Sequence, residues 1–354
     1  MEETITHRGW TIGLDLGDRH SHACVLSESG EVVARFRVAT TRKAVEKALG
    51  GYGGARVVLE VGTHSPWVSA ALEELGFEVV VANPRRLRSI TQSDAKDDRT
   101  DAEQLARLGR VDPKLLSPIR HRGLSAQRDR SLLMVRDGLV RSRVLLVNQA
   151  RGLAKPLGLR LPACTTEGFA SRMRREGWDE AFPGMKALVG VIDTLTQQIR
   201  ALDREIEAVG RERYGVTQQL RQVAGVGPVT SLAYVLTIED PARFARSRSV
   251  GAYLGLRPRR RQSGSQDPLL RITKAGDPYL RRLLVQSAHY ILGPFGPDTD
   301  LRRFGLRLIA RGGRAGRKKA LVAVARKLAV LLHRLWVTGE VYEPLRGEAR
   351  EAAA

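Results

Sequence analysis

Residues 10–38, WTIGLDLGDRHSHACVLSESGEVVARFRV, decide the fold of the first part of the chain. Apolar and polar residues alternate along this stretch, as they do in half-buried β-strands. A Ser-Glu-Ser-Gly turn signal interrupts it at residues 27–30. We therefore expect two strands with a turn between them.

Strands and helices continue to alternate after this stretch. We expect a helix over 41–50, a strand over 55–61, a helix over 65–76, a strand over 77–84 and a helix that begins near Asp97. Such alternation is typical of an α/β domain, which we place at residues 8–112.

Beyond a short proline-containing link the pattern becomes helical, and we assign residues 122–214 to a helical arm. Apolar residues recur there at three- and four-residue steps, and the second helical run carries a heptad seam. The seam residues are Leu188, Ile192, Leu195, Ile199, Leu202 and Ile206. The irregular segment 157–184 separates the two runs, which predicts an antiparallel coiled coil with an irregular tip. Two core helices of a bundle are the alternative, but the face opposite the seam is polar.

The charge is unevenly distributed along the chain. In total, 59 Lys and Arg stand against 38 Asp and Glu, a net charge of +21. Residues 1–110 hold 15 basic and 16 acidic residues, so 44 basic and 22 acidic residues remain in 111–354. This excess indicates that a third, mainly helical region at 216–340 binds nucleic acid. A surface charged only for solubility is the alternative, although such surfaces mix both signs.

Composition argues against several other classes of protein. The chain lacks the roughly 18–20 consecutive apolar residues of a membrane helix and shows no apolar signal segment at its start. Its two cysteines, Cys24 and Cys164, have no metal-type spacing, which argues against a zinc site or a disulfide framework. We therefore expect a cytoplasmic protein with no membrane partner.

Carboxylates interrupt two apolar strands, Asp15 in TIGLDLG and Glu60 in VVLEVG. A buried carboxylate needs a metal ion or a cationic partner. Four further acidic residues stand at the start of the helix expected near Asp97: Asp94, Asp97, Asp98 and Asp101. Oxygen ligands of this kind hold one or two Mg²⁺ ions, or Mn²⁺, in phosphodiester chemistry.

The residues alone leave alternatives open at this site. An acidic residue at the start of a helix is often only a cap, which is the alternative role of Asp94 and Asp97. Spacing does not choose between Asp97 and Asp98 as the partner of Asp101. The IGLDLG stretch is also similar to the first phosphate loop of actin-like ATPases, which share the RNase H-like core. Those proteins need a second Gly-rich phosphate loop, and none follows here.

The basic region carries a candidate DNA-binding turn and a candidate nucleophile. In QVAGVGPVTSLAYVL (222–236), Gly225 and Gly227 lie in a turn between two expected helices, a helix-hairpin-helix pattern. A plain helical turn is the alternative. Downstream, Ser263 lies in a Gly-flanked loop among arginines that can neutralise charge on a phosphate. No general base stands beside it, so a contact to the DNA backbone is the alternative role.

Candidate nucleic-acid contacts surround this loop and recur near the C-terminus. They are Arg257, Arg259, Arg260, Arg261, Arg271, Lys274, Arg281, Arg282, Arg317, Lys318 and Lys319. Such clusters suit contacts to a phosphate backbone, with a solvated helix face as the alternative. His289 and His333 fall on amphipathic helices, where we expect ordinary core or interface residues.

Together these motifs resemble those of the IS110 family of insertion-sequence transposases, over about residues 10–336. The matching pieces are, in order, GLDLG with Asp15, LEVGTHSPW with Glu60, KDDRTDAEQLA with Asp98 and Asp101, GVGPVTS, AYLGLRPRRRQSG with Ser263, and RITKAGDPYLRRLLV. The resemblance implies an RNase H-like domain similar to RuvC resolvase, followed by a serine transposase domain. The family pattern Lys-x-Asp-x-x-Asp-Ala selects Asp98 over Asp97.

The resemblance also implies a nucleophile and a function. The family's serine precedes a glycine, often as Ser-Ser-Gly. Here Gln262 stands first, so the match points to Ser263, with Ser265 as the second choice. By this resemblance the protein excises and integrates a mobile element, using a structured guide RNA that pairs with donor and target DNA. A transient phosphoserine link, Mg²⁺-loaded carboxylates and a dimer or tetramer would take part.

Two other functions stay open on the sequence. The first is a metal-dependent, RuvC-like junction endonuclease in which Ser263 only grips DNA. The second is a catalytically dead nucleic-acid-binding remnant. The complete acidic set and the intact Ser-Gly pair argue against the second.

Overall fold

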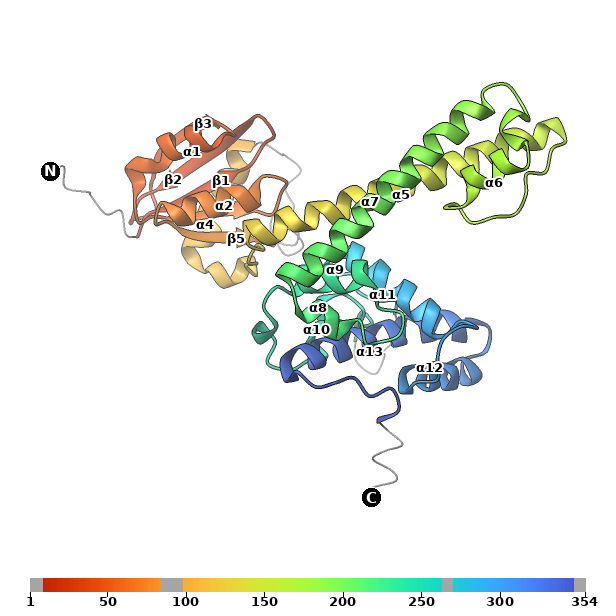
Figure 1. Ribbon diagram of the computed structural model, residues 1–354. Coiled ribbons are helices and arrows are strands. Elements are labelled where there is room, and N and C mark those ends of the chain that lie inside the picture. Colours follow the sequence, from red (N-terminus) through yellow and green to blue (C-terminus); the bar gives the residue numbers. More distant parts are fainter. Residues whose placement is uncertain (1–8, 84–97, 263–269, 347–354) are drawn as a thin grey trace, which may run out of the picture. The chain divides into compact units, whose positions relative to one another are not determined.

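The computed structural model describes residues 9–83, 98–262 and 270–346 (Figure 1). The chain divides into two compact units, residues 1–125 and 126–354. The predicted α/β domain lies in the first unit, and most of the predicted arm and the whole basic region lie in the second. Asp94, Asp97, Ser263 and Ser265, which the sequence singles out, lie outside the described residues.

The first unit is built on a five-stranded sheet with the strand order β3-β2-β1-β4-β5. The strands are β1 (Thr11–Asp15), β2 (His20–Leu26), β3 (Val32–Ala39), β4 (Arg56–Glu60) and β5 (Glu78–Ala82). β2 pairs antiparallel with both β1 and β3, whereas β1, β4 and β5 run parallel. The sheet is therefore mixed, with its antiparallel part formed by the start of the chain.

The prediction of two strands over residues 10–38 is wrong, because the stretch forms three. A tight turn after β1 explains the difference. A Cβ at Gly17 would lie 2.1 Å from the carbonyl oxygen of His20, so only glycine lets the chain reverse there. The predicted turn at 27–30 then separates β2 from β3, and Gly30 supplies its positive φ of 89°.

Helices cover both faces of the sheet. On one face lie α1 (Arg42–Leu49) and α2 (Ser65–Glu74), on the other α4 (Asp98–Val111). The core under α1 and α2 contains Ile12, Leu14, Val25, Val45, Leu49, Val57, Leu59, Val68 and Leu72. Under α4, Ala102 and Ala106 pack with Cys24 and Leu26. Successive residues of a strand alternate between these two cores.

The second unit contains a long antiparallel helix pair, α5 (Leu124–Ala154) and α7 (Met185–Arg213), which corresponds to the predicted arm (Figure 1). A short helix, α6 (Phe169–Arg175), lies in the tip between them. Ile192, Ile199 and Ile206 of the predicted seam are buried. Their buried partners along α7 include Val189, Thr196 and Gly210, whereas the predicted Leu188, Leu195 and Leu202 are only half-buried.

The middle of the arm is polar. Arg143 of α5 is only 8% exposed, and its Nη1 donates to Oγ1 of Thr196 at 3.3 Å. Its Nε has no hydrogen-bond partner among the described residues. About two turns earlier on the same helix, Arg136 of α5 forms an ion pair with Asp203 of α7. This polar stretch separates the apolar cluster at the tip from the larger core at the other end of the arm.

The basic region is helical. Its helices are α8 (Val216–Leu220), α9 (Pro228–Ile238), α10 (Arg248–Tyr253), α11 (Pro278–Ile291), α12 (Asp300–Arg311) and α13 (Gly316–Thr338). The buried α9 lies at the centre, where the Tyr234 hydroxyl donates to the Ala329 carbonyl of α13 at 2.7 Å. His333 is 1% exposed and hydrogen-bonded to Ser247 and to the Pro241 carbonyl, so its predicted core position is confirmed.

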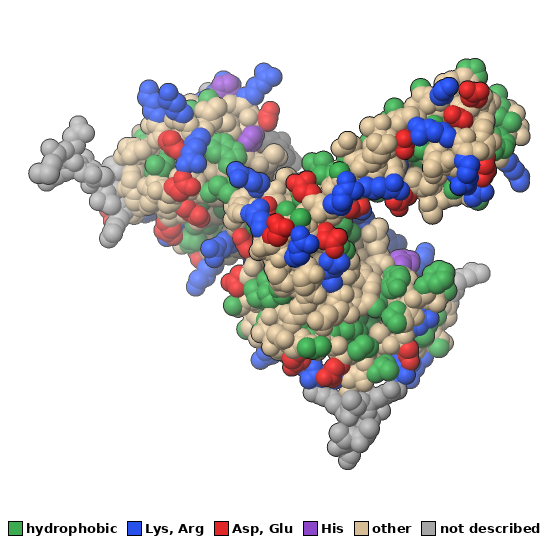
Figure 2. All heavy atoms as spheres, viewed as in Figure 1, with side chains coloured by type: hydrophobic (Ala, Val, Ile, Leu, Met, Phe, Trp, Pro, Cys, Tyr) green, Lys and Arg blue, Asp and Glu red, His purple; other side chains and the backbone are tan. Residues whose placement is uncertain are grey.

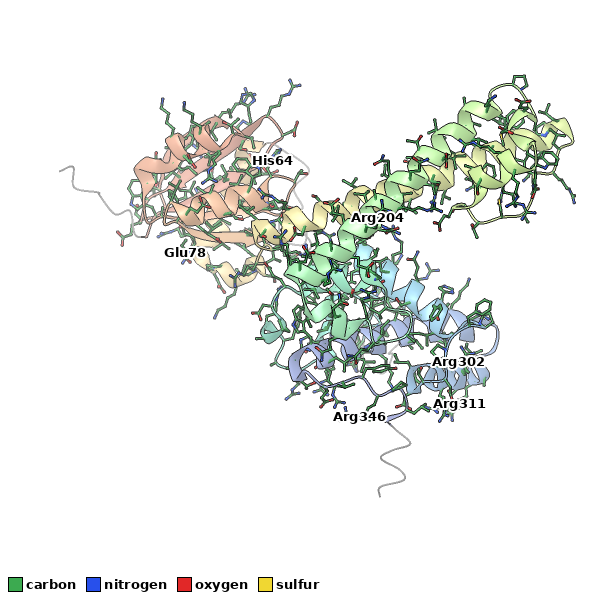
Figure 3. The ribbon with its side chains drawn as sticks, in the orientation of Figure 1. His64, Glu78, Arg204, Arg302, Arg311 and Arg346 are labelled. Carbon is green, nitrogen blue, oxygen red and sulfur yellow. The ribbon has the colours of Figure 1, made fainter. Side chains whose placement is uncertain are left out.

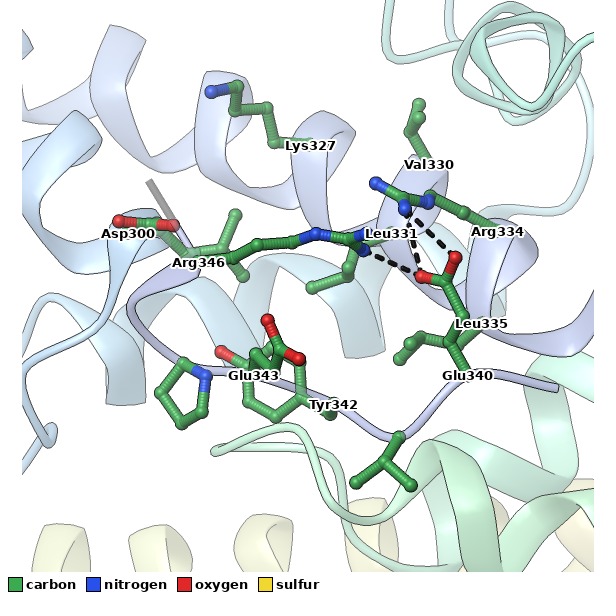
Figure 4. Close-up of a pocket in the computed structure, with 13 residues that line it drawn as sticks. Asp300, Lys327, Val330, Leu331, Arg334, Leu335, Glu340, Tyr342, Glu343 and Arg346 are labelled. Carbon is green, nitrogen blue, oxygen red and sulfur yellow. Dashed lines mark hydrogen bonds and ion pairs between the residues drawn. The ribbon is translucent and has the colours of Figure 1, made fainter. Parts of the chain in front are cut away.

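The chain after α13 is held against that helix by an ion-pair network (Figure 4). The Glu340 carboxylate accepts from Arg334 at 2.8 Å and from Arg346 at 2.6 Å. These two arginines hold the pKa of Glu340 below its usual value, mainly through the hydrogen bond from Arg346. Within the described ranges of the chain, no helix is long and apolar enough to cross a membrane.

Candidate active site

The two strand carboxylates of the sequence analysis lie side by side. Asp15 is the last residue of β1 and Glu60 the last of β4. The two strands pair in parallel with Leu14 opposite Leu59, so Asp15 and Glu60 are each one residue beyond that pair. Neighbouring strands lie about 4.8 Å apart. Both residues are half-buried, at the carboxyl edge of the sheet.

Both carboxylates belong to the face of the sheet that α4 covers. Gly13 of β1 and Val58 of β4 lie opposite each other and contact α4. Because side chains alternate along a strand, Asp15 shares the face of Gly13, and Glu60 shares the face of Val58. The sheet therefore directs the two carboxylates toward the same helix.

The direction of α4 brings its acidic first turn to this edge. A Cβ at Gly13 would lie 1.8 Å from the Ala102 carbonyl oxygen, so the helix crosses β1 at that point. Farther along α4, the Gly109 carbonyl accepts from Nη1 of Arg56, the first residue of β4, at 3.0 Å. The helix thus runs antiparallel to β1 and β4, and its first residue, Asp98, lies toward their carboxyl ends.

Asp98 and Asp101 occupy the first turn of α4, where the sequence places them. Asp98 precedes Ala102 by one turn, and Asp101 is half-buried. Across the parts of the chain that the structure describes, no three His, Cys, Asp or Glu side chains come together as a metal site. The side chain of Asp98 is not among those described. The oxygen-only donors Asp15 and Glu60 suit a hard cation such as Mg²⁺.

A chain of two hydrogen bonds through His64 lies at the same edge, and the sequence analysis did not predict it. The indole Nε1 of Trp67 donates to Nδ1 of His64 at 3.0 Å. Because that nitrogen accepts, Nε2 carries the proton and donates to Oδ1 of Asp18 at 3.3 Å. His64 follows β4 and Asp18 follows β1. Figure 3 shows His64 at one end of the sheet unit and Glu78, the first residue of β5, at the other.

The predicted turn of the basic region joins α8 to α9. Gly225 has a φ of 83°, and a Cβ there would lie 3.1 Å from the Ser287 carbonyl oxygen of α11. Gly227 precedes Pro228, the first residue of α9. The turn borders a hollow of about 450 Å³, whose walls include Arg221 and Tyr290. Gly225 is thus needed for packing as well as for the turn.

Two family models of transposases match the chain. One, described as a transposase, matches residues 12–156. The other, described as the transposase IS116/IS110/IS902 family, matches residues 217–299. The chain is 30% identical over 346 residues to a putative transposase, y4rJ, of Sinorhizobium fredii, covering 91% of this chain and 86% of the relative. The chain belongs to the IS110 family of insertion-sequence transposases.

Other relatives of this IS110-family chain carry related names. The transposase for insertion sequence element IS1111A of Coxiella burnetii is 28% identical over 339 residues, covering 94% of this chain and 90% of the relative. A probable family 20 transposase of Pseudomonas aeruginosa is 29% identical over 349 residues, covering 94% and 98%. The family resemblance inferred from the motifs is confirmed.

Backbone pairing in this IS110-family chain brings several predicted arginines together. Pro258 and Ile272 form a β-bridge. The Arg259 amide donates to the Arg271 carbonyl at 2.9 Å, and the Thr273 amide donates to the Arg257 carbonyl at 2.9 Å. Residues 257–259 and 271–273 therefore lie side by side. Ser263 and Ser265 fall between these two segments in the sequence and outside the described residues.

The other predicted cations have different surroundings. Arg281 donates from Nη1 to the carbonyls of Leu254, at 3.1 Å, and Ala275, at 2.7 Å, so it supports the local fold. Arg282 pairs with Asp137 of α5. Arg271, Lys274, Lys318 and Lys319 border an apolar cavity of about 810 Å³ between the bridge and α13. Arg260, Arg261 and Arg317 are exposed. Nucleic-acid contact by these residues stays a prediction.

Proposed function

We propose that this transposase cuts and rejoins DNA with a Mg²⁺-bound carboxylate site formed by Asp15, Glu60, Asp98 and Asp101. One observation carries the proposal. Asp15 and Glu60 end adjacent parallel strands on the sheet face covered by α4, and Asp98 and Asp101 stand in the first turn of that helix. The strand order, with an antiparallel meander beside parallel strands, supports an RNase H-like, RuvC-like fold.

The carboxylates would hold one or two Mg²⁺ ions, which stabilise the attacking and leaving oxygens of a phosphodiester displacement. The chain's own contribution is the placement of its oxygen donors. Asp15 and Glu60 come from a rigid sheet, so they lose little conformational entropy when the site forms. The nearby pair of His64 and Asp18 adds a hydrogen-bonded imidazole to the same edge.

The covalent step is proposed for Ser263, from its position in the family motif. Its Oγ would attack phosphorus, a bond from Oγ to phosphorus would form, and the phosphorus–oxygen bond to the leaving strand would break. The leaving oxygen would take up the proton that the serine hydroxyl gives up. Attack by a hydroxyl of the incoming strand would reverse these changes and free the serine. Arg257, Arg259 and Arg271, on the paired segments that flank residues 260–270, suit neutralisation of the phosphate.

The remaining parts of the proposal are the partners. The basic region would bind DNA and a structured guide RNA, the arm would serve assembly, and the protein would work as a dimer or tetramer. The excess of cationic residues after residue 110 supports a polyanion partner of this kind.

Three substitutions test the chemistry. In a recombination assay with the element ends, D15N and E60Q should abolish Mg²⁺-dependent strand cleavage while DNA binding persists. S263A should abolish the covalent protein–DNA adduct as well as recombination. Cleavage that survives in S263A without an adduct would favour the metal-only endonuclease. A chain that binds DNA but never cleaves it, even with Mg²⁺ or Mn²⁺, would be the catalytically dead remnant.

A further inference from the structure

A row of polar side chains crosses the sheet at the level of the carboxylates. In the antiparallel register of β1 and β2, Asp15 lies opposite His22. In the register of β2 and β3, His22 lies opposite Arg37. Directly opposite residues of antiparallel strands project from the same face. Asp15, His22 and Arg37 therefore share the α4 face, in the order acid, imidazole, guanidinium.

Arg37, at the cationic end of this row, is positioned to donate hydrogen bonds. Nη2 of Arg37 donates to Nδ1 of His20 at 2.9 Å. Since Nδ1 accepts this bond, the proton of the neutral imidazole is on Nε2, which is then also a donor. Both side chains are exposed at the edge of the sheet. The pair presents N–H groups of two residues to the solvent, as an anion-binding site requires.

The neighbouring arginine on β3 is engaged differently. Arg35 lies opposite Cys24 and forms an ion pair of 2.6 Å with Glu103 of α4. The partner described for Arg37 is the imidazole of His20, so the Arg37 charge is not matched by a carboxylate within the described residues. Of the two arginines on this face, Arg37 is therefore the one available to an external anion.

A hollow lies where this row meets the edge strand. Its volume is about 290 Å³, and it is lined by His22, Ala23, Arg35, Phe36 and Arg37. In Figure 2, Lys, Arg and His side chains gather along the rim of the sheet unit. Two strand spacings, about 10 Å, separate Asp15 from Arg37 across the sheet. A nucleic-acid strand has phosphates at short, regular intervals, so one strand can reach both positions.

We propose that His20, His22 and Arg37 form a phosphate-binding subsite for the DNA strand that the carboxylates cut. A phosphate next to the reacting one binds in the hollow against Arg37 and His22, with His20 held beside Arg37 by its hydrogen bond. This inference rests on the proposed function for the identity of the strand. The subsite sets the path of the DNA, from the edge strand β3 across β2 toward Asp15 and Glu60.

A purely structural role is the competing explanation. Charged side chains on an edge strand also prevent edge-to-edge pairing of sheets. In that case Arg37 would affect solubility but would not bind a particular phosphate. The two roles differ in whether the contribution of Arg37 depends on the charge of one phosphate in the DNA.

The experiment measures binding of the full chain to fluorescein-labelled DNA that carries one element end. Each phosphate in turn is replaced by a neutral methylphosphonate, and affinity is measured by anisotropy over a range of salt concentrations. The D15N background prevents cleavage. R37Q should weaken binding about 3- to 30-fold and lower the slope of log K against log salt by about 0.7–0.9, the loss of one phosphate contact. At one phosphate position, methylphosphonate should weaken binding by the unsubstituted chain but not by R37Q.

R42Q provides the matched control. Arg42 carries the same charge on the same unit, but it lies on α1, on the opposite face of the sheet, and pairs with Glu46 and Glu74. It should leave the methylphosphonate profile unchanged. Identical profiles for R37Q and the unsubstituted chain would overturn the subsite. H20A and H22A should alter the same phosphate position, and circular dichroism verifies folding. The experiment measures binding and not cleavage, so a failure of the proposed cleavage chemistry can be told apart from a failure of the phosphate-binding subsite.

Discussion

Gly13 of β1 lies directly beneath Ala102 of α4. A Cβ on Gly13 would come within 1.8 Å of the Ala102 carbonyl oxygen and within 2.6 Å of the Ala106 nitrogen. Backbone atoms of a helix cannot move aside as a flexible side chain can. This contact sets the height of α4 above the sheet, and hence the distance from its acidic first turn to Asp15.

We predict that G13A destabilises the first unit and moves the acidic first turn of α4 away from Asp15. Because the added methyl group meets backbone atoms, α4 must shift away from β1. Overpacking of this kind costs about 1–3 kcal/mol, and occasionally more. Urea denaturation followed by circular dichroism should show the loss of stability. Mg²⁺-dependent DNA cleavage should also fall under conditions where G13A is still folded.

G51A is the control for this substitution. Gly51 lies in the same unit, its φ is not positive, and a Cβ there would meet nothing within 4 Å. It should change stability by less than about 0.5 kcal/mol. Equal stability and equal cleavage in G13A and G51A would show that the contact of Gly13 with α4 does not position the site.

For the sheet unit, the sequence predicted most strands and the two strand carboxylates, but it did not predict how the chain turns between strands. Apolar alternation located β1, and short apolar runs located β4 and β5; Asp15 and Glu60 were conspicuous because they interrupt apolar runs. The turn at Gly17 was missed, because the reason for a glycine there is its approach to the His20 carbonyl. That approach depends on three-dimensional structure and leaves no periodic signal.

The row of Asp15, His22 and Arg37 could not be predicted for a related reason. Register decides which residues of two strands face each other, and a shift by one residue would move His22 to the other face. The hydrogen bond between His64 and Asp18 likewise joins two loops that are distant in sequence. The surrounding arginines made Ser263 a candidate nucleophile, but only the family motif favoured that role over a contact to the DNA backbone.

A substitution in the arm should be stabilising. Arg143 is 8% exposed between α5 and α7, and burial lowers the pKa of its guanidinium. Its Nε has no partner among the described residues. Replacing a buried charge by an apolar side chain of similar length is often neutral or stabilising by about 1–4 kcal/mol. We expect R143M to raise the midpoint of thermal unfolding of the arm.

R141M serves as the comparison on the same helix. The Arg141 side chain is 71% exposed and pairs with Asp137 one turn away. It should change stability by less than about 0.5 kcal/mol. A lower melting temperature for R143M than for R141M would mean that the Arg143 charge is compensated in solution, by a bound anion or by a second protein chain.

The two cysteines should differ in reactivity. Cys24 is fully buried, and burial, aided by the Glu103 carboxylate, raises the pKa of its thiol. Cys164 is partly exposed, in the tip of the arm. Because the thiolate is the reactive form, iodoacetamide at pH 8 should modify Cys164 in the folded protein and Cys24 only after denaturation. Mass spectrometry of tryptic peptides measures both. Rapid labelling of native Cys24 would show that α4 opens from the sheet.

The last prediction concerns the junction between the arm and the basic region, where Tyr214 donates from its hydroxyl to Oδ2 of Asp129 at 2.6 Å. Asp129 is 6% exposed. Burial, reinforced by the bond to Asp129, raises the pKa of Tyr214 to about 12. Removing this donor by Y214F takes a hydrogen bond from a buried carboxylate, which should cost about 1–3 kcal/mol at pH 7. Urea denaturation measures the loss.

The pH dependence of that loss separates the hydrogen bond from simple packing. The raised pKa of Tyr214 means that its stabilisation is complete below the unfolded value of about 10 and is lost as pH rises toward about 12. The deficit of Y214F should therefore shrink between pH 10 and 12, whereas a packing defect would persist at every pH. The half-exposed Tyr290 supplies the control, since Y290F should change stability by less than about 0.5 kcal/mol. A Y214F deficit that stays constant up to pH 12 would show that the bond to Asp129 contributes nothing.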